Sequence, residues 1–247
     1  MAAQSFAPPH PAFLLTRPAA ASERFAAALR ESFGTAARIV IAPLMAPEFL
    51  HPALPPGPFD ALILTSETAA EAARRLSADG VDLPLRAFCV GDRTAGAAAG
   101  AGFHAQSASG DAGALLRLIQ RAQPGGRFLH LRGRESAGAI VQQLGALDII
   151  AREAVIYDQK PLPLTTAAGA LLAGDAPVVL PLFSPRSADL MARAGPFRAP
   201  LWVAALSPAV ADHARALHPD RMAIADRPDA QSLMRAAEYL CAAGGRT

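Results

Sequence analysis

Six short segments of the chain combine residue types that bind anions, and each follows a run of apolar residues. They are Thr16-Arg17-Pro18, Thr65-Ser66, residues 90–95, residues 132–134, residues 184–186 and Ser207-Pro208. Backbone N–H groups at the start of a helix bind anions, and an arginine beside them adds a forked donor for carboxylates. Helix capping by itself explains each serine or threonine taken singly. The six segments together favour an anionic ligand.

Tyr157 is one of two tyrosines in the chain and ends the apolar run Ala154-Val-Ile-Tyr157. A phenol with a pKa of ~10 stays protonated at neutral pH and can donate a proton or a hydrogen bond to a leaving oxygen. The position, just before Pro161 and Pro163, also suits an aromatic anchor in a segment that connects two domains. The residue alone does not decide between the two roles.

Familiar catalytic and metal-binding patterns are missing from the sequence. The histidines show no metal-ligand spacing, and Cys89 and Cys241 are too few and too far apart for a zinc site or a disulfide framework. The sequence contains no Gly-x-Ser-x-Gly elbow, no P-loop and no complete dinucleotide fingerprint. Hydrolase and dehydrogenase functions are therefore disfavoured, and neither a metal nor a cofactor is predicted.

Composition and charge narrow the class of protein further. Hydrophobic residues make up 52% of the 247 residues, charged residues make up 18%, and the net charge is only +2. The chain can form a packed core, and a nucleic-acid partner is not expected. The sequence shows no signal peptide and no apolar run of the ~20 residues that would span a membrane. We therefore expect a soluble protein located in the cytoplasm.

Short apolar runs alternate with helical patterns along the whole chain, which predicts parallel sheets covered by helices. Strands are expected at residues 13–16, 38–43, 61–64, 87–90, around 104, 128–131, 149–157, 178–183, 201–204 and 222–225. Helices are expected at residues 22–33, 68–78, from 94, 112–122, 139–147, 165–172, 188–194, 209–217 and 230–242. The proline-rich residues 47–58 are expected to form an irregular connection.

The two halves of the chain resemble each other. Ser66 and Ser184, each between a strand and a helix, are 118 residues apart, and so are the similar segments 111–117 and 229–235. Residues 13–17 match residues 128–132 at an offset of 115. Three matches in order indicate a duplication that produced two similar domains. Ligands of parallel sheets bind at the carboxyl ends of the strands, so we expect a cleft lined by both copies.

These features together resemble the uroporphyrinogen-III synthase family over residues 14–240. The resemblance is carried by Leu15-Thr-Arg-Pro18, Leu64-Thr-Ser66, Cys89-Val-Gly-Asp-Arg-Thr-Ala95, Leu131-Arg-Gly133, Ala154-Val-Ile-Tyr157, Phe183-Ser-Pro185 and Ala225-Asp-Arg-Pro228. It implies an α/β protein of two flavodoxin-like parallel-sheet domains joined by a two-stranded linker. One domain would be discontinuous (residues 1–42 plus 159–247), the other inserted (residues 43–158), and the duplicated halves would exchange their first strand–helix units.

The resemblance also implies the reaction. A lyase of this family converts linear hydroxymethylbilane, with loss of water, into a macrocycle whose ring D is inverted, in tetrapyrrole and heme biosynthesis. Tyr157 would be the general acid for the leaving hydroxyl. The substrate carboxylates would be bound by Thr16, Arg17, Ser66, Thr94, Arg132, Gly133 and Ser184.

Two alternatives remain. One is a non-catalytic two-domain protein that binds a small anionic ligand, and the other is a regulator with a degenerate synthase-like module, which usually carries an additional DNA-binding or membrane segment. The family reading predicts a cytoplasmic monomer without cofactor or metal. Its expected partners are hydroxymethylbilane and, transiently, hydroxymethylbilane synthase.

Overall fold

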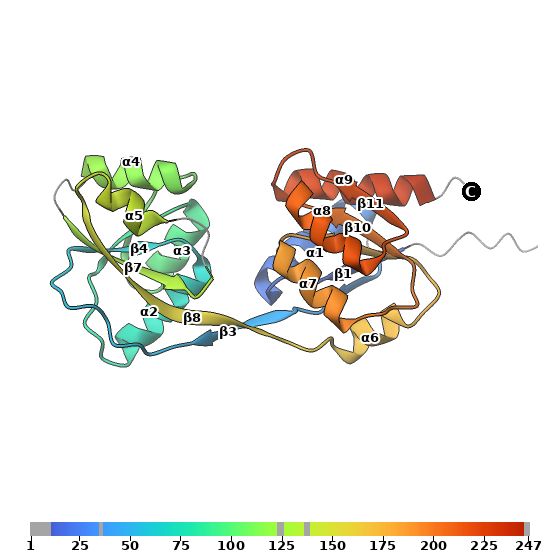
Figure 1. Ribbon diagram of the computed structural model, residues 1–247, viewed down its shortest axis with the longest axis horizontal. Coiled ribbons are helices and arrows are strands. Elements are labelled where there is room, and N and C mark those ends of the chain that lie inside the picture. Colours follow the sequence, from blue (N-terminus) through green and yellow to red (C-terminus); the bar gives the residue numbers. More distant parts are fainter. Residues whose placement is uncertain (1–10, 35–36, 123–125, 136–138, 245–247) are drawn as a thin grey trace, which may run out of the picture. The chain divides into compact units, whose positions relative to one another are not determined.

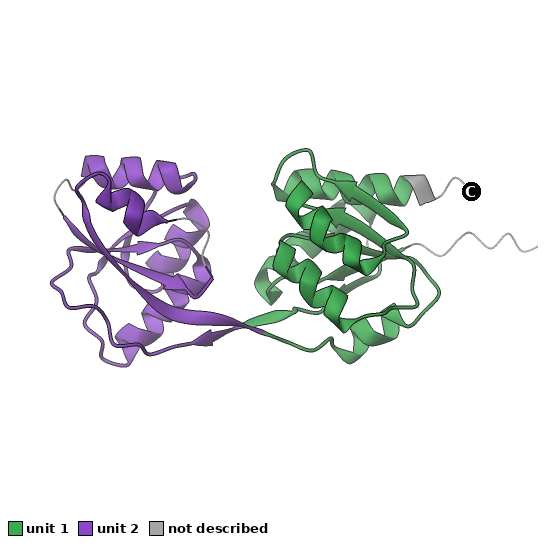
Figure 2. Cartoon of the chain, in the orientation of Figure 1, with its two compact units in different colours: residues 1–46, 161–247 green, residues 47–160 purple. Residues whose placement is uncertain are grey.

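The chain divides into two compact units, which Figure 2 shows in different colours. The computed structural model describes residues 11–34, 37–122, 126–135 and 139–244. Unit 1 comprises residues 1–46 and 161–247, and unit 2 comprises residues 47–160. The chain therefore passes between the units twice. The boundaries expected from the sequence, after residues 42 and 158, lie four and two residues earlier on the same two connections.

Unit 1 contains a five-stranded sheet with helices on both faces (Figure 1). Its strands are β1 (Ala12–Leu15), β2 (Ile39–Ile41), β9 (Val178–Leu182), β10 (Leu201–Ala205) and β11 (Arg221–Ile224). Its helices are α1 (Ala19–Phe33), α6 (Thr166–Leu172), α7 (Pro185–Ala194), α8 (Pro208–Ala214) with the 3₁₀ turn Arg215–Leu217, and α9 (Ala230–Gly244). The strand order is β2-β1-β9-β10-β11 and every pairing is parallel. This is the flavodoxin-like order 2-1-3-4-5.

Unit 2 contains the second sheet, which has six strands. These are β3 (Met45–Phe49), β4 (Ala61–Leu64), β5 (Arg86–Cys89), β6 (His104–Ser107), β7 (Arg127–Gly133) and β8 (Ile150–Pro161). The helices are α2 (Glu67–Ala78), α3 (Asp92–Gly100), α4 (Ala112–Ala122) and α5 (Ile140–Gly145). The strand order is β3-β8-β7-β4-β5-β6. The pairs β8-β7, β7-β4, β4-β5 and β5-β6 are parallel. Hydrogen bonds from Leu50 N to Ile156 O and from Leu162 N to Leu44 O show that the edge strand β3 runs antiparallel to β8.

The two sheets have the same arrangement once the duplication is taken into account. Strands β7 and β8 of unit 2 occupy the places of β1 and β2 in unit 1, and β4, β5 and β6 occupy those of β9, β10 and β11. Each unit is therefore built from the first two strands of one half of the chain and the last three strands of the other. This is the exchange of strand–helix units that the resemblance implied.

Alternating side chains divide the core of each unit into two apolar layers, one on each face of the sheet. In unit 2, Leu129 and Leu131 pack with Ile156 and with helix α2 on one face. Phe128 packs on the other face, against α4 and α5. These layers bury the central strands, such as β4 and most of β7, which explains why those strands read as short continuous apolar runs.

The proline-rich stretch 47–58 differs from the expectation in one respect. Its first residues belong to strand β3, which includes Pro47, and residues 50–59 have no regular structure. Proline is tolerated there because β3 lies at the edge of the sheet, where one side of the strand needs no ladder hydrogen bonds. Its neighbour β8 continues to Pro161, beyond the predicted end at residue 157.

Candidate active site

The predicted serines lie at the carboxyl ends of strands and begin helices. Ser66, Ser184 and Ser207 are the N-cap residues of α2, α7 and α8. The Oγ atom of each accepts a hydrogen bond from the backbone N–H three residues later, at 3.0, 3.2 and 3.4 Å respectively. Capping therefore accounts for the position of all three hydroxyls. Each hydroxyl can still make a second hydrogen bond, and in Ser184 this is already the 2.9 Å contact with the Ser187 hydroxyl.

Ser66 uses this second capacity to contact Tyr157. The Ser66 Oγ atom lies 3.0 Å from the Tyr157 hydroxyl, at hydrogen-bond distance. The tyrosine is only 8% exposed and packs in the same apolar layer as Leu131 and Ile156. Two of the residues singled out in the sequence, 91 positions apart, are thus brought together at the start of α2.

Gly133 completes this cluster from strand β7. It pairs with Tyr157 of β8, next to a register shift between Arg132 and Gly133. A Cβ atom at position 133 would lie 2.6 Å from Cζ, 2.8 Å from Cε2 and 2.9 Å from the hydroxyl oxygen of Tyr157. The aromatic ring therefore rests directly on the glycine, and no other amino acid leaves room for it in this position.

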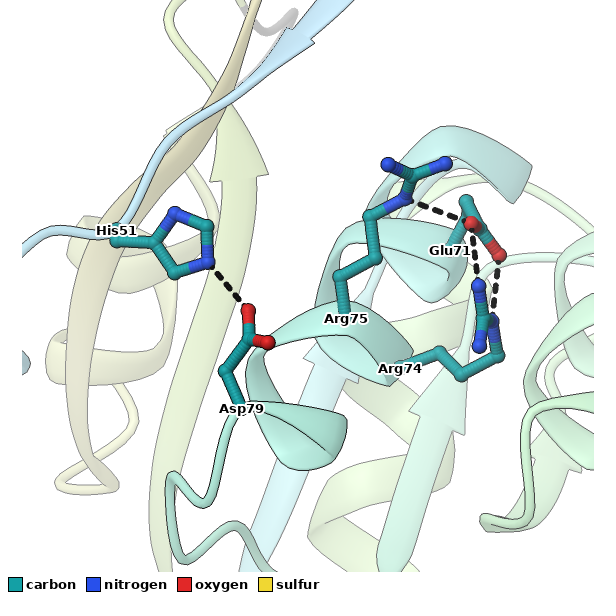
Figure 3. A network of polar contacts seen from close by, with 5 residues as sticks. All are labelled: His51, Glu71, Arg74, Arg75 and Asp79. Atoms are coloured by element: carbon teal, nitrogen blue, oxygen red, sulfur yellow. Dashed lines mark hydrogen bonds and ion pairs between the residues drawn. The ribbon is translucent and has the colours of Figure 1, made fainter.

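Contacts along one side of unit 2 connect helix α2 to strand β3 and to the irregular residues that follow it (Figure 3). The Arg75 guanidinium lies over the Phe49 ring, 4.0 Å from its centroid, and His51 Nε2 lies 2.6 Å from Asp79 Oδ2. Glu71 accepts hydrogen bonds from Arg74 and Arg75, and the bond from Arg74 is the main reason why its pKa falls to about 2. The contacts of Arg75 with Phe49 and of Asp79 with His51 connect the C-terminal half of α2 to residues 49–51. Ser66 caps the other end of this helix.

Thr94 occupies the neighbouring helix start in unit 2. It lies in the first turn of α3, which follows strand β5 and is preceded by Gly91. Because β5 pairs with β4 in parallel, Thr94 and Ser66 belong to adjacent strand ends of one sheet. The Thr94 side chain is buried, with 5% exposure.

Three of the predicted residues, Thr16, Arg17 and Ser184, belong to unit 1. Thr16 is buried and follows β1 directly, and Arg17 comes next. The Arg17 guanidinium lies over the ring of Phe183, 4.0 Å from its centroid. Since Ser184 follows Phe183, this stacking connects the ends of the neighbouring strands β1 and β9. The sequence analysis quoted Phe183 as part of the motif Phe183-Ser-Pro185 but gave its ring no role in the site.

Arg132 turns to the opposite face of the unit 2 sheet from Tyr157. Its Nη2 atom donates to Glu153 Oε1 at 2.7 Å, while Nη1 donates to the carbonyl oxygens of Gly133 and Arg134 at 2.9 and 3.1 Å. The hydrogen bond raises the pKa of Arg132 and lowers that of Glu153. Arg132 is therefore held at the end of β7 by groups on both of its guanidinium arms.

His130 lies on the same face of β7, beneath this ion pair. It is 2% exposed, and neither ring nitrogen has a hydrogen-bond partner among the described residues. Burial lowers its pKa from 6.5 to about 4. The imidazole is therefore neutral at pH 7.

A hollow of about 1030 Å³ opens in unit 2 beside the ion pair of Arg132 and Glu153. Its lining includes Arg132 and Arg134, which the sequence analysis noted, and Arg127, Arg152 and Glu153, which it did not. No short motif marks these residues. Only the pairing of β7 with β8 places them side by side.

Comparisons with known proteins agree with this fold. The family model described as uroporphyrinogen-III synthase HemD matches residues 23–235. The crystal structure of uroporphyrinogen-III synthetase from Helicobacter pylori 26695 aligns with a TM-score of 0.63 and 18% identity, over 93% of this chain and 99% of that chain. No curated protein matches the chain in sequence.

Two structures from Thermus thermophilus also align with the chain. One, the native wild-type uroporphyrinogen III synthase in its second crystal form, has a TM-score of 0.36 and 18% identity, over 94% of this chain and 97% of that chain. A further Thermus thermophilus uroporphyrinogen III synthase has a TM-score of 0.34 and 17% identity, over 93% and 99%. The family model covers most of the residues and defines the assignment: the chain belongs to the uroporphyrinogen-III synthase family.

Proposed function

We propose that this chain is a uroporphyrinogen-III synthase that cyclises hydroxymethylbilane with loss of water and inversion of ring D. The observation that carries the proposal is the family match over residues 23–235. The two-unit fold supports it because it has the same architecture as a solved member of the family. Within the described residues, no helix is long and apolar enough to cross a bilayer.

We assign the general acid to Tyr157 on the basis of its contact with Ser66. The Ser66 Oγ atom already accepts the Ala69 N–H, so its hydroxyl proton can be donated to the Tyr157 oxygen 3.0 Å away. The phenolic proton then points away from Ser66, toward a bound substrate. This chain of donors also ends at the start of α2, where the helix dipole stabilises negative charge. Ser66 therefore holds the Tyr157 oxygen in place and leaves the phenolic proton to be donated to the substrate.

In the proposed first step, Tyr157 protonates the terminal hydroxyl of hydroxymethylbilane, and the C–O bond breaks to release water. The resulting cationic carbon is attacked by the last pyrrole ring at the position that already carries its bridge carbon, which gives a spirocyclic intermediate. The bond between ring D and that bridge carbon then breaks, and the bridge carbon reattaches at the free α position of ring D, so that the ring is inverted. The proton lost from this α position restores the phenol. One water leaves for each substrate, and no oxidant or reductant is consumed. Holding the folded conformation that leads to inversion then needs positioning rather than a strong catalytic group.

The substrate carboxylates would be bound by the strand-end residues of both units. We propose Thr16, Arg17 and Ser184 in unit 1, and Ser66, Thr94, Arg132 and Gly133 in unit 2. In unit 1 the support is the stacking of Arg17 on Phe183, which holds a guanidinium beside the start of α7. In unit 2 the support is that Arg132 donates hydrogen bonds to the carbonyl oxygens of Gly133 and Arg134 at the end of β7. Gly133 would contribute its backbone.

We also propose a cytoplasmic monomer that contacts hydroxymethylbilane synthase transiently. A transient contact would shorten the time in which the reactive substrate closes without inversion. Coupled turnover with both enzymes tests this. Adding an inactive Tyr157 variant in excess should lower the type III fraction if the partner is contacted, and should leave it unchanged if the substrate passes through free solution.

The function itself is tested by an isomer assay. Hydroxymethylbilane is generated in place, the purified chain is added, and the oxidised porphyrins are separated by chromatography. A dominant type III product is expected, and only type I product, as in the enzyme-free control, would refute the proposal. Tyr157→Phe keeps the ring and removes the acid, so we expect a loss of rate of ~10²- to 10⁴-fold. An unchanged rate and isomer ratio would exclude Tyr157 as the acid.

A further inference from the structure

The hollow on unit 2 carries far more positive than negative charge. Its lining contains four arginines, Arg127, Arg132, Arg134 and Arg152, against the single carboxylate of Glu153. Arg132 neutralises Glu153 at 2.7 Å, and Arg134 pairs with Asp158 at 3.1 Å, outside the lining. In the part of the chain that the structure describes, neither Arg127 nor Arg152 pairs with a carboxylate.

Two buried guanidinium N–H groups in this lining have no partner. The Nε atoms of Arg127 and Arg132 are both inaccessible to solvent and make no hydrogen bond among the described residues. A buried unsatisfied donor on a charged group is unfavourable by several kcal/mol, and such groups in native proteins usually have an ion or a water as partner. Each of these two guanidinium groups therefore has a donor whose hydrogen-bonding capacity the described residues do not use.

The hollow is separate from the Tyr157 cluster. Ala151 of the lining packs with Phe128 in the layer beneath α4 and α5, whereas Tyr157 packs with Leu129 in the layer beneath α2. Arg127 and Arg152 alternate along their strands with Phe128 and Ala151, so their side chains begin on the other face of the sheet. The hollow is therefore lined by side chains from both faces of β7 and β8, and Tyr157 is not among them.

The equivalent place in unit 1 provides an internal comparison. Residues 13–17 correspond to residues 128–132, so the paired residues Leu15 and Ile41 of unit 1 stand where unit 2 pairs His130 with Glu153. The covering helix also differs, because α1 has 15 residues and α5 has 6. The same fold can therefore carry aliphatic side chains on this face under a long helix. Unit 2 instead has a histidine and a glutamate at the equivalent positions.

We propose that this hollow is a second anion-binding site, specific for a ligand with several carboxylates. Arginine forks match carboxylates in pairs, and four of them around one space suit a polycarboxylate better than a single anion. The volume of about 1030 Å³ is at the upper end of the ~300–1,000 Å³ typical of small-molecule sites, which favours a large ligand. Apolar residues of the lining, among them Pro55 and Val141, would contact its carbon skeleton. Arg132 belongs both to this hollow and to the proposed substrate site, so the test rests on Arg127 and Arg152, which have no role in the proposed synthase reaction.

The test compares calorimetric titrations of wild-type protein and three variants. Arg127→Gln/Arg152→Gln removes two cations of the lining. Arg117→Gln/Arg121→Gln removes the same charge from the exposed side of α4 in the same unit and serves as the matched control. Glu153→Gln removes the carboxylate of the lining. The probes are uroporphyrin I as a large polycarboxylate, citrate as a small one and pyrophosphate as a phosphate.

We expect the affinity for uroporphyrin I to fall at least tenfold in Arg127→Gln/Arg152→Gln, since each charge-assisted hydrogen bond contributes a factor of roughly 10 to 100. The control should stay within about twofold, and Glu153→Gln should bind severalfold more tightly because a repulsive charge is lost. Binding of the probe at another site is common to all four proteins and cancels in the comparison. The citrate titration shows whether a small polycarboxylate is sufficient.

Equal affinity of Arg127→Gln/Arg152→Gln and the control would overturn the proposal, and so would pyrophosphate binding more tightly than either carboxylate probe. Thermal unfolding without ligand verifies that each variant is folded. If the double variant does not fold, the single variant Arg152→Gln replaces it, because Arg152 is exposed. The isomer ratio should be the same in wild type and Arg127→Gln/Arg152→Gln. Loss of synthase activity in the wild type would therefore contradict the proposed function and leave this site untouched.

Discussion

Replacing Gly133 by alanine tests how closely the Tyr157 ring is positioned. The added Cβ would lie 2.6 Å from Cζ and 2.9 Å from the hydroxyl oxygen of Tyr157, whereas ordinary contacts are 3.4–4 Å. The ring must therefore move by about 0.8 Å at Cζ, and the hydroxyl by about 0.5 Å. Gly133 is not in the left-handed region of backbone conformation, so the alanine introduces only this overlap.

The expected consequences are a loss of activity and a smaller loss of stability. A shift of this size breaks or compresses the 3.0 Å contact with Ser66. Misplacement of a catalytic group by about 1 Å costs ~10²-fold in rate, and overpacking costs ~1–3 kcal/mol in the free energy of unfolding. The type III product formed per minute and the denaturant midpoint measure the two effects. Gly96→Ala is the matched control, because its Cβ meets nothing within 4 Å and lies in helix α3.

A double-mutant cycle separates the overlap from other causes. Tyr157→Leu removes the ring atoms that the new Cβ would meet, so Gly133→Ala should destabilise the Tyr157→Leu protein by at least ~1 kcal/mol less than the wild type. Equal destabilisation in both backgrounds would show that the glycine is needed for some other reason. Wild-type rate and stability in Gly133→Ala would refute the positioning argument altogether.

Three further predictions concern neighbouring groups. Ser66→Ala and Ser207→Ala each remove a helix cap and should each lower the free energy of unfolding by about 1 kcal/mol, but only Ser66→Ala should reduce the synthase rate, by roughly tenfold, because only Ser66 contacts Tyr157. The His130 pKa is lowered from 6.5 to about 4, so between these values the unfolded chain binds a proton that the folded chain does not, and stability falls as pH falls. His130→Leu should abolish about 2 kcal/mol of the stability difference between pH 7 and pH 5; denaturant titrations at both pH values check this, and an unchanged difference would contradict it. Burial raises the pKa of the Cys89 thiol to about 11, so native protein should react with a thiol reagent at this residue far more slowly than denatured protein at pH 8, and equal rates in mass-spectrometric labelling would be the contrary result.

The fold could be predicted largely because the central strands are completely buried. Continuous apolar runs such as 61–64 and 178–182 are the form that a central parallel strand takes, and the family resemblance implied how the duplicated halves exchange their units. The strand β3 was missed because its sequence contains Pro47 and only an edge position makes that residue acceptable. Local pattern carries no information on which strand lies at an edge.

The candidate site was predictable in its residue types and not in its geometry. Serine between a strand and a helix indicates a cap, and Ser66 is one. Its contact with Tyr157 depends on the alignment of β8 with β7, including the register shift beside Gly133, which no local motif specifies. The same shift puts Arg132 on one face and Tyr157 on the other. From the sequence, Arg132 and Gly133 were consecutive residues of one motif; in the fold they face different neighbours.

The duplication shows how one ancestral position can acquire two electrostatic roles. Arg17 and Arg132 are equivalent in the repeat, yet Arg17 lies over the Phe183 ring and Arg132 is paired with Glu153. An aromatic ring holds a guanidinium while leaving its charge in place, whereas a carboxylate at 2.7 Å cancels it. At the strand ends, unit 1 therefore places its guanidinium over an aromatic ring, while unit 2 supplies the phenol and its serine partner. We infer that both units hold substrate carboxylates and that unit 2 alone serves proton donation. Phe183→Leu should then weaken substrate binding with little effect on the chemical step, whereas Ser66→Ala should slow the chemical step.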